Sequence, residues 1–141
     1  MSPSPPAGWY AVTRRNAAAE PLTVRGHGEA VRAVAFAPDA TLLATASSDR
    51  TIKLWGVPEF DLRAAWKGHT GAVRALAWAP DGARLASGAD DATIRVWDAS
   101  SGATLDVLSG HEARVNTLAW LDAGRIVSGS SDGTVRVWTL A

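Results

Sequence analysis

Three sets of side chains that could carry out acid–base chemistry recur along this chain of 141 residues. Each set contains one histidine, one serine or threonine, and one aspartate that lies four residues after the hydroxyl, and a tryptophan follows. A hydroxyl, an imidazole and a carboxylate are the groups of a serine-hydrolase triad, and histidine is also a common metal ligand. The sets are His27, Thr45, Asp49 and Trp55; His69, Ser87, Asp91 and Trp97; and His111, Ser128, Asp132 and Trp138.

The threefold repetition favours a structural role for these sets over catalysis or metal binding. A catalytic triad normally occurs once in a protein, because its residues act together as one site. The three histidines fall in different repeats of the chain, whereas zinc ligands must all lie about 2.0–2.1 Å from one ion. We therefore predict that the chain is not an enzyme and that it binds no metal and no cofactor.

The sets are spaced by an internal repeat of about 42 residues. Gly-His pairs at 26–27, 68–69 and 110–111 open the repeats, and short runs rich in strand-forming residues follow. Turns rich in Pro, Asp, Ser and Gly separate the runs. A four-stranded antiparallel sheet that recurs at this period is a blade of a β-propeller. In the first repeat the runs are AVRAVAF (30–36), LLATAS (42–47), TIKLW (51–55) and LRAAW (62–66).

Each repeat resembles the repeats of the WD-repeat family. Gly-His, then an aspartate, then a strand that ends in tryptophan follow in the order typical of that family, and residues 93–98 read Thr-Ile-Arg-Val-Trp-Asp. The Trp-Asp pair itself is present only at Trp97-Asp98, since Gly56 and Thr139 follow the other two tryptophans. The resemblance covers residues 21–141. It implies an all-β fold of three four-stranded antiparallel blades, with repeats at about 26–67, 68–109 and 110–141.

The resemblance also implies that each set is a hydrogen-bonded chain from aspartate to histidine to hydroxyl to the indole N–H. Both faces of a blade are covered by neighbouring blades, so polar side chains within it need partners. Histidine, serine and tryptophan together supply complementary donors and acceptors. We expect these sets to be structural tetrads that tie the loop before the first strand to the second and third strands.

Other aromatic residues also follow the repeat. Phe36, Trp78 and Trp120 occur once per repeat at the end of the first strand, and we expect them to pack in the core. Trp66 has Leu108 as its counterpart, so the sequence leaves open whether it lies in the core or in an exposed patch.

Three blades are too few to close a propeller, which typically has four to eight. Residues 21–25 precede the first Gly-His as 62–66 and 104–108 precede the others, and the third repeat stops after its third strand. We predict that 21–25 is an outer strand that completes the last blade of another copy, so that copies assemble head-to-tail into a ring. A homodimer with six blades is preferred over a homotrimer with nine. The competing interpretation is a fragment of a longer propeller.

Composition narrows the choice of partner and compartment. The net charge is zero, which gives no electrostatic reason to expect nucleic acid or a membrane surface as a partner. The absence of cysteine excludes disulfides and thiolate sites and fits a reducing compartment, so we expect a cytoplasmic protein. Residues 1–20, with three prolines in MSPSPP, are predicted to be disordered or irregular.

The resemblance places a partner-binding surface at one end of the blades. It includes the residue before each tetrad aspartate and the residues three and five positions after each histidine. Its arginines could hold the carboxylate or phosphate of an acidic peptide, or could be ordinary solvated side chains. We predict a non-catalytic protein-interaction scaffold; the alternative is a regulatory or sensor module of a larger signalling enzyme. The surface comprises Arg32, Ser48, Arg74, Asp90, Arg114, Asn116 and Ser131, with Ala30 and Ala72 beside them.

Overall fold

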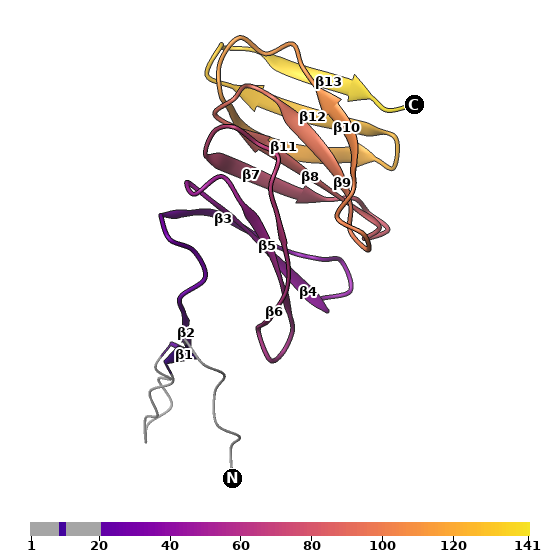
Figure 1. Ribbon diagram of the computed structural model, residues 1–141. Helices are drawn as coiled ribbons and strands as arrows, with labels where there is room; N and C mark the ends of the chain where they lie inside the picture. The colour runs from indigo at the N-terminus through magenta and orange to yellow at the C-terminus, as the bar shows by residue number, and fades with distance from the viewer. Residues whose placement is uncertain (1–8, 11–20) are drawn as a thin grey trace.

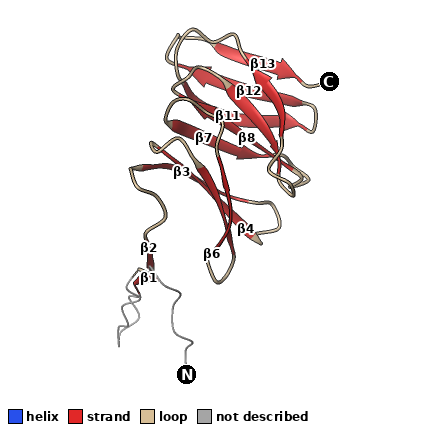
Figure 2. Cartoon of the chain, in the orientation of Figure 1, coloured by secondary structure: helices blue, strands red, loops and turns tan. Residues whose placement is uncertain are grey.

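The computed structural model describes residues 9–10 and 21–141 (Figure 1). The segment 1–20, predicted to be disordered or irregular, lies outside the described residues except for Trp9 and Tyr10. The described chain consists of strands, turns and loops (Figure 2). None of its elements is a helix that could span a membrane.

Three antiparallel sheets, here called blades 1 to 3, follow the three repeats, and this confirms the predicted all-β, bladed fold. Blades 1 and 2 have four strands each, and blade 3 has three. Blade 1 contains β3 (Val31–Phe36), β4 (Leu42–Ser47), β5 (Ile52–Gly56) and β6 (Asp61–Trp66). Blade 2 contains β7 (Val73–Trp78), β8 (Arg84–Ala89), β9 (Ile94–Asp98) and β10 (Thr104–Leu108). Blade 3 contains β11 (Val115–Asp122), β12 (Arg125–Ser130) and β13 (Val135–Thr139).

A small two-stranded sheet precedes blade 1. β1 (Trp9–Tyr10) pairs antiparallel with β2 (Thr23–Val24), with Tyr10 opposite Thr23. β2 lies within the segment 21–25 that the repeat identifies as an outer strand. Within this chain its strand partner is therefore β1 and not a strand of any blade.

The blades stack face to face, with their first strands side by side: β3 lies beside β7, and β7 beside β11 (Figure 1). Side chains alternate between the two faces of a strand, so each blade can pack against a neighbour on either side. Blade 2 uses both faces. Leu85 and Trp97 pack against blade 1, while Ile94 and Val96 pack against blade 3.

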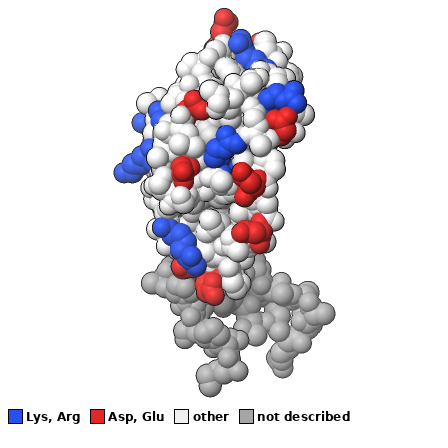
Figure 3. Space-filling model, turned by 90° about the vertical axis from the view of Figure 1, so that its right-hand side faces the viewer, with Lys and Arg blue, Asp and Glu red and all other residues white. Residues whose placement is uncertain are grey.

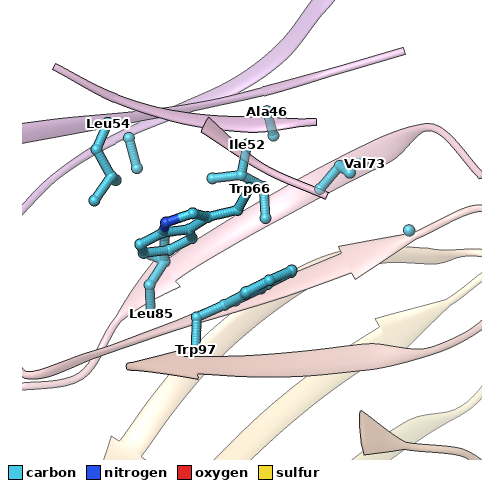
Figure 4. Packing of buried hydrophobic residues seen from close by; sticks show 9 residues of the cluster. Ala46, Ile52, Leu54, Trp66, Val73, Leu85 and Trp97 are labelled. Carbon is cyan, nitrogen blue, oxygen red and sulfur yellow. The ribbon is translucent and has the colours of Figure 1, made fainter. Parts of the chain in front are cut away.

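The core between blades 1 and 2 is organised around two tryptophans. Trp66 at the end of β6 stacks on Trp97 of β9, with ring centroids 5.3 Å apart and planes inclined by 18° (Figure 4). Ile52 and Leu54 of β5 lie in the same cluster as Leu85 of β8. Trp66 is buried, so the structure places it in the core and not in an exposed patch.

Close approach between blades requires a small residue on the second strand. A Cβ atom at Gly88 would lie 2.6 Å from Cγ1 of Val115 in blade 3. The same position in blade 1 is Ala46, which belongs to the cluster that contains Val73 of blade 2. In blades 2 and 3, the valine at the start of the first strand, Val73 or Val115, therefore packs where the preceding blade has a small residue.

The aromatic residues that end the first strands also join the blades. Trp78 Nε1–H donates to the carbonyl oxygen of Ala35 at 2.9 Å, and Trp120 Nε1–H donates to that of Ala77 at 2.7 Å. Phe36 is largely exposed, so the prediction that it packs in the core is wrong within this chain. The reason is that Phe36 lies on the face of blade 1 on which no other blade of this chain packs.

Candidate functional site

The tetrad of blade 2 brings four separate segments together. His69 lies in the loop before β7, Ser87 on β8, Asp91 in the turn after β8, and Trp97 on β9. The His69 Nδ1 atom lies 2.9 Å from Asp91 Oδ2, and its Nε2 atom lies 2.7 Å from Ser87 Oγ. Trp97 Nε1–H donates to the same Ser87 oxygen at 2.8 Å. One hydroxyl therefore joins the imidazole to the indole.

Blades 1 and 3 repeat this geometry closely. The histidine Nδ1 to aspartate distances are 2.9 Å for His27 and 2.8 Å for His111. The histidine Nε2 to hydroxyl distance is 2.7 Å in both blades. The indole to hydroxyl distances are 3.0 Å and 2.8 Å. The remaining members of these tetrads are Thr45, Asp49 and Trp55 in blade 1, and Ser128, Asp132 and Trp138 in blade 3.

The donors and acceptors of each tetrad fit only one direction of hydrogen bonding when the histidine is neutral. An ionised carboxylate only accepts, so Nδ1–H of the histidine donates to it. Nε2 is then an acceptor for the serine O–H, and the serine oxygen accepts from the indole N–H. Ser87 and Ser128 are buried and use their hydroxyl hydrogen within the tetrad. This arrangement satisfies buried polar groups and presents no hydroxyl to a substrate.

A fifth residue, which the sequence analysis missed, completes each tetrad. Thr51, Thr93 and Thr134 lie two residues after the aspartates, and each Oγ1–H donates to the aspartate Oδ1 at 2.6, 2.7 and 2.6 Å. Each threonine backbone N–H donates to the same oxygen, at 2.9, 3.0 and 2.8 Å. The signal in the sequence was the recurrence of threonine at this spacing.

The turn that presents the aspartate has a left-handed residue directly after it. The φ angles are +74° at Arg50, +67° at Ala92 and +84° at Gly133. Only glycine adopts this conformation without steric cost, so blades 1 and 2 hold a strained residue here. The hydrogen bonds that the aspartates accept from the following threonines hold the turn closed.

These contacts hold the tetrad carboxyls in their ionised form. Burial raises the pKa of Asp91, but hydrogen bonds from His69 and Thr93 outweigh this effect and keep the pKa well below its ordinary value. Burial likewise raises the pKa of Asp49, and hydrogen bonds from Thr51 and His27 lower it further than burial raises it. At Asp132 the hydrogen bond from Thr134 is the largest effect, and the pKa is again lowered.

Acid is therefore expected to destabilise the fold. Aspartate carboxyls of the unfolded chain have a pKa of about 3.9, and the pKa values of the tetrad aspartates in the folded chain are lower. Their contribution to stability is complete above that pH and is lost as the pH falls towards the folded pKa values. Urea denaturation followed by circular dichroism between pH 7 and pH 2 measures this loss. Asp91→Asn should be less stable at pH 7 and should lose less between pH 4 and pH 2; equal losses in both proteins would contradict the assignment.

The repeated geometry is matched by a known family. The model of the family described as "WD domain, G-beta repeat" matches the chain three times, over residues 19–56, 60–98 and 102–139. This chain belongs to the WD-repeat family. Each match ends one residue after a tetrad tryptophan, at Trp55, Trp97 and Trp138. The family model therefore groups each repeat with the outer strand that precedes its Gly-His pair.

Solved WD-repeat structures share the fold. "Structure of U3-55K" superposes on this chain with a TM-score of 0.78 at 30% sequence identity, over 82% of this chain. "Crystal structure of RRP9 WD40 repeats" gives a TM-score of 0.77 at 30% identity, also over 82% of this chain. In each case the match spans 37% of the other chain. This WD-repeat chain thus corresponds to somewhat more than a third of each of those proteins.

The predicted partner-binding residues lie in contact within each WD repeat. Arg32 Nε–H donates to Ser48 Oγ at 2.7 Å, and Arg74 is paired with Asp90 through two hydrogen bonds. In blade 3, Asn116 Nδ2–H and Arg114 Nε–H donate to the same oxygen, Ser131 Oγ, at 2.8 and 3.2 Å. The residue before each tetrad aspartate donates its backbone N–H to the carbonyl oxygen three positions after the histidine, which belongs to Ala30, Ala72 or Arg114.

Two alternative chemistries can be compared with this geometry. Residues 129–133 read Gly-Ser-Ser-Asp-Gly, which has the letters of the Gly-x-Ser-x-Gly motif of α/β-hydrolases. That motif joins a strand to a helix, whereas this segment joins β12 to β13. Its central Ser131 accepts hydrogen bonds from Arg114 and Asn116 and has no histidine partner. In the described residues no three His, Asp or Glu side chains are grouped to hold a metal ion.

Proposed function

We propose that this WD-repeat chain is a non-catalytic scaffold that binds a protein or peptide at the end of the blades where the tetrad aspartates lie. One observation carries the proposal. In each blade a polar side chain on the first strand, Arg32, Arg74 or Asn116, donates a hydrogen bond at the surface to the side chain of the residue before the tetrad aspartate. The three first strands lie side by side, so these pairs form one continuous surface. The tetrads beneath it are satisfied internally, which leaves recognition as the role of the exposed end.

The charges on this surface favour an acidic group in the ligand. Arg32 and Arg114 donate to serine hydroxyls, whereas Arg74 is paired with the carboxylate of Asp90 and has a raised pKa because of that hydrogen bond. A carboxylate or phosphate of a ligand can therefore replace the serines as acceptor for two of the arginines. Figure 3 shows one face of the molecule. In its described part, positively and negatively charged side chains are interspersed, and no large block of one sign is seen.

Loss of the two arginines is expected to weaken binding of an acidic probe. A fluorescein-labelled hexaglutamate peptide, followed by fluorescence anisotropy, should bind Arg32→Gln/Arg114→Gln at least about tenfold more weakly than the unchanged protein, because charge-assisted hydrogen bonds contribute roughly 1.5–3 kcal/mol each. Arg63→Gln/Arg125→Gln is the matched control, since these arginines pair with Asp61 and Asp122 away from this surface. If both double variants bind equally, or if the unchanged protein does not bind, recognition of acidic ligands by this surface is excluded.

The scaffold also includes an assembly step. We propose that copies of the chain associate head-to-tail into a closed propeller, with two copies and six blades preferred over three copies and nine blades. Each copy supplies three blades, so two copies give six and three copies give nine. Six lies within the range of about four to eight blades that is usual for propellers. The outward faces of blades 1 and 3, which no other blade covers among the described residues, support the proposal, because exposed apolar sheet faces and open strand edges favour association. Light scattering should give two or three times the chain mass of 14.7 kDa, and a single chain mass would overturn the assembly step.

A further inference from the structure

Arg50 is an exposed arginine at the end of blade 1 that belongs to the proposed binding surface. It directly follows the tetrad aspartate Asp49, and Ser48, which accepts the hydrogen bond of Arg32, lies two residues before it. Consecutive Cα atoms are about 3.8 Å apart, so the Cα atoms of Arg50 and Ser48 are separated by no more than about 7.6 Å. Two arginines therefore lie close to the same serine.

The backbone of Arg50 is held in a conformation that is unfavourable for any residue with a Cβ atom. Its φ angle is +74°, in the left-handed region where the Cβ atom is crowded. Its N–H donates to the carbonyl oxygen of Ser47 at 3.1 Å, and Ser47 N–H donates to that of Thr51 at 3.2 Å. Ser47 itself is fully buried. The turn therefore presents the Arg50 side chain from a rigid base, which reduces the entropy lost when that side chain binds a ligand.

The other two blades show that the turn does not need an arginine at this position. The equivalent residues are Ala92 in blade 2 and Gly133 in blade 3, with φ angles of +67° and +84°. Each donates its N–H to the carbonyl oxygen three residues before it, as Arg50 does. Within the described residues the Arg50 guanidinium makes no hydrogen bond or ion pair. A strained residue whose side chain does not stabilise the turn is a candidate for a functional role.

Blade 1 also has the most positive end of the three blades. The comparison covers the exposed segments beside each tetrad: the five residues after the histidine, and the residues directly before and after the aspartate. Blade 1 has two arginines and one glutamate in these segments, whereas blades 2 and 3 have one side chain of each sign. In the order of the blades, these residues are Arg32, Arg50 and Glu29; Arg74 and Asp90; and Arg114 and Glu112. Of the three ends, that of blade 1 therefore attracts an acidic group most strongly.

Arg32 keeps donors available for a ligand, whereas Arg74 is occupied. Among the described residues, Arg32 donates only through Nε, to Ser48 Oγ at 2.7 Å. A guanidinium has five N–H donors, so its terminal nitrogens can bind a ligand without breaking this bond. Arg74 donates through Nε and Nη2 to the two carboxylate oxygens of Asp90. The carboxylate in blade 2 thus takes the place that an acidic group of a ligand could take in blade 1.

We propose that Arg50 is a binding residue of this surface, and that Arg50 and Arg32 together form the subsite that holds the acidic group of the ligand. The proposal deepens the proposed function and rests on it, because it names the place at which the acidic peptide binds. Two guanidinium groups beside one serine can share a carboxylate through charge-assisted hydrogen bonds. Asp90 in the neighbouring blade repels a second acidic group, so the acidic side chain of the peptide is directed to blade 1.

Matched glycine substitutions separate the charge of Arg50 from the strain of its turn. Arg50→Gly removes both, and Ala92→Gly removes the strain at the same position of blade 2 without removing a charge. Arg50→Gly should bind fluorescein-labelled hexaglutamate at least about fivefold more weakly than the unchanged protein, because charge-assisted hydrogen bonds are lost. Ala92→Gly should bind the peptide as the unchanged protein does. Urea denaturation should show both variants to be at least as stable as the unchanged protein, since glycine adopts the left-handed conformation without steric cost.

Two further variants test the backbone and the charge at Arg50 separately. Arg50→Ala keeps a Cβ atom and therefore the strain, and it should lose as much affinity for hexaglutamate as Arg50→Gly. Arg50→Lys keeps the charge but not the planar guanidinium, so it should recover part of the affinity. Fluorescence anisotropy provides the measurement for all four variants.

The outcomes distinguish this proposal from the proposed function. If Arg50→Ala and Arg50→Gly bind hexaglutamate as tightly as the unchanged protein, while Arg32→Gln/Arg114→Gln binds more weakly, Arg50 is not a binding residue and the acidic-ligand surface stands. If Ala92→Gly weakens binding as much as Arg50→Gly, the shape of the turns is responsible, and the assignment of Arg50 is overturned. If the unchanged protein does not bind hexaglutamate, the proposed recognition of acidic ligands fails together with the subsite.

Discussion

Replacing Trp97 with alanine is expected to lower the free energy of unfolding by about 3–5 kcal/mol, the usual loss for a fully buried aromatic side chain. Trp97 is 2% exposed, stacks on Trp66 and donates its indole N–H to Ser87. Its removal opens a cavity between blades 1 and 2 and also breaks the tetrad of blade 2. Urea denaturation measures the change, and one fixed protein concentration is used because the proposed association would make apparent stability depend on concentration.

Trp138→Ala is the matched control for this substitution. Trp138 occupies the same strand position in blade 3 and makes the same 2.8 Å hydrogen bond, here to Ser128, but its side chain is only half-buried. We expect a smaller loss of stability, because less apolar surface returns to water. Equal losses for Trp97→Ala and Trp138→Ala would show that packing between blades 1 and 2 is not the cause.

Replacing Ser87 with alanine is expected to cost roughly 2–4 kcal/mol, although it removes a single oxygen atom. The Ser87 hydroxyl is the partner of both His69 Nε2 and Trp97 Nε1, so its loss leaves two buried polar groups unsatisfied at about 1–3 kcal/mol each. No water can replace it without a cavity, since Ser87 is fully buried. The same urea denaturation provides the measurement.

Two further serines test whether the position in the tetrad causes the effect. Ser128→Ala should destabilise the fold comparably, because Ser128 is buried and makes the same two bonds in blade 3. Ser131→Ala should change stability by no more than about 0.5 kcal/mol, as is usual for exposed positions. A loss at Ser131 as large as that at Ser87 would argue against the tetrad as the source of the stability.

Much of the fold could be predicted from the repeat. Gly-His pairs, tetrad aspartates and strand-ending tryptophans recur at nearly constant spacing, and the strands of each blade lie between them. The hydroxyls could be placed in the same way, since Thr45, Ser87 and Ser128 each lie four residues before the aspartate, whereas the position two residues before it is Ala89 in the second repeat. These positions could be predicted because each blade buries the same polar groups and therefore has the same residue types at the same spacing.

Residues that break the repeat were harder to predict. The sequence left Trp66 open because its counterpart is Leu108, and only the stacking on Trp97 shows it to be core. Phe36 follows the repeat yet is exposed. The sequence analysis treated Arg32, Arg74 and Arg114 alike as possible partners of an acidic group. In the structure Arg74 is paired with the carboxylate of Asp90, whereas the other two donate to serine hydroxyls. Each outcome depends on a neighbouring strand or blade, which a pattern within one repeat does not contain.

The sequence alone determined the strands, their order within each blade and the members of the tetrads. The alternation of apolar and polar residues and the spacing of the repeated residues are both contained in one repeat of about 42 residues. The tertiary structure decided which equivalent residues are buried and which are exposed. Val73 and Val115 are covered and Val31 is not, although all three occupy the same place in their repeats. Burial is a property of the contact between two blades, so it is set by the neighbour on each side and not by the repeat itself.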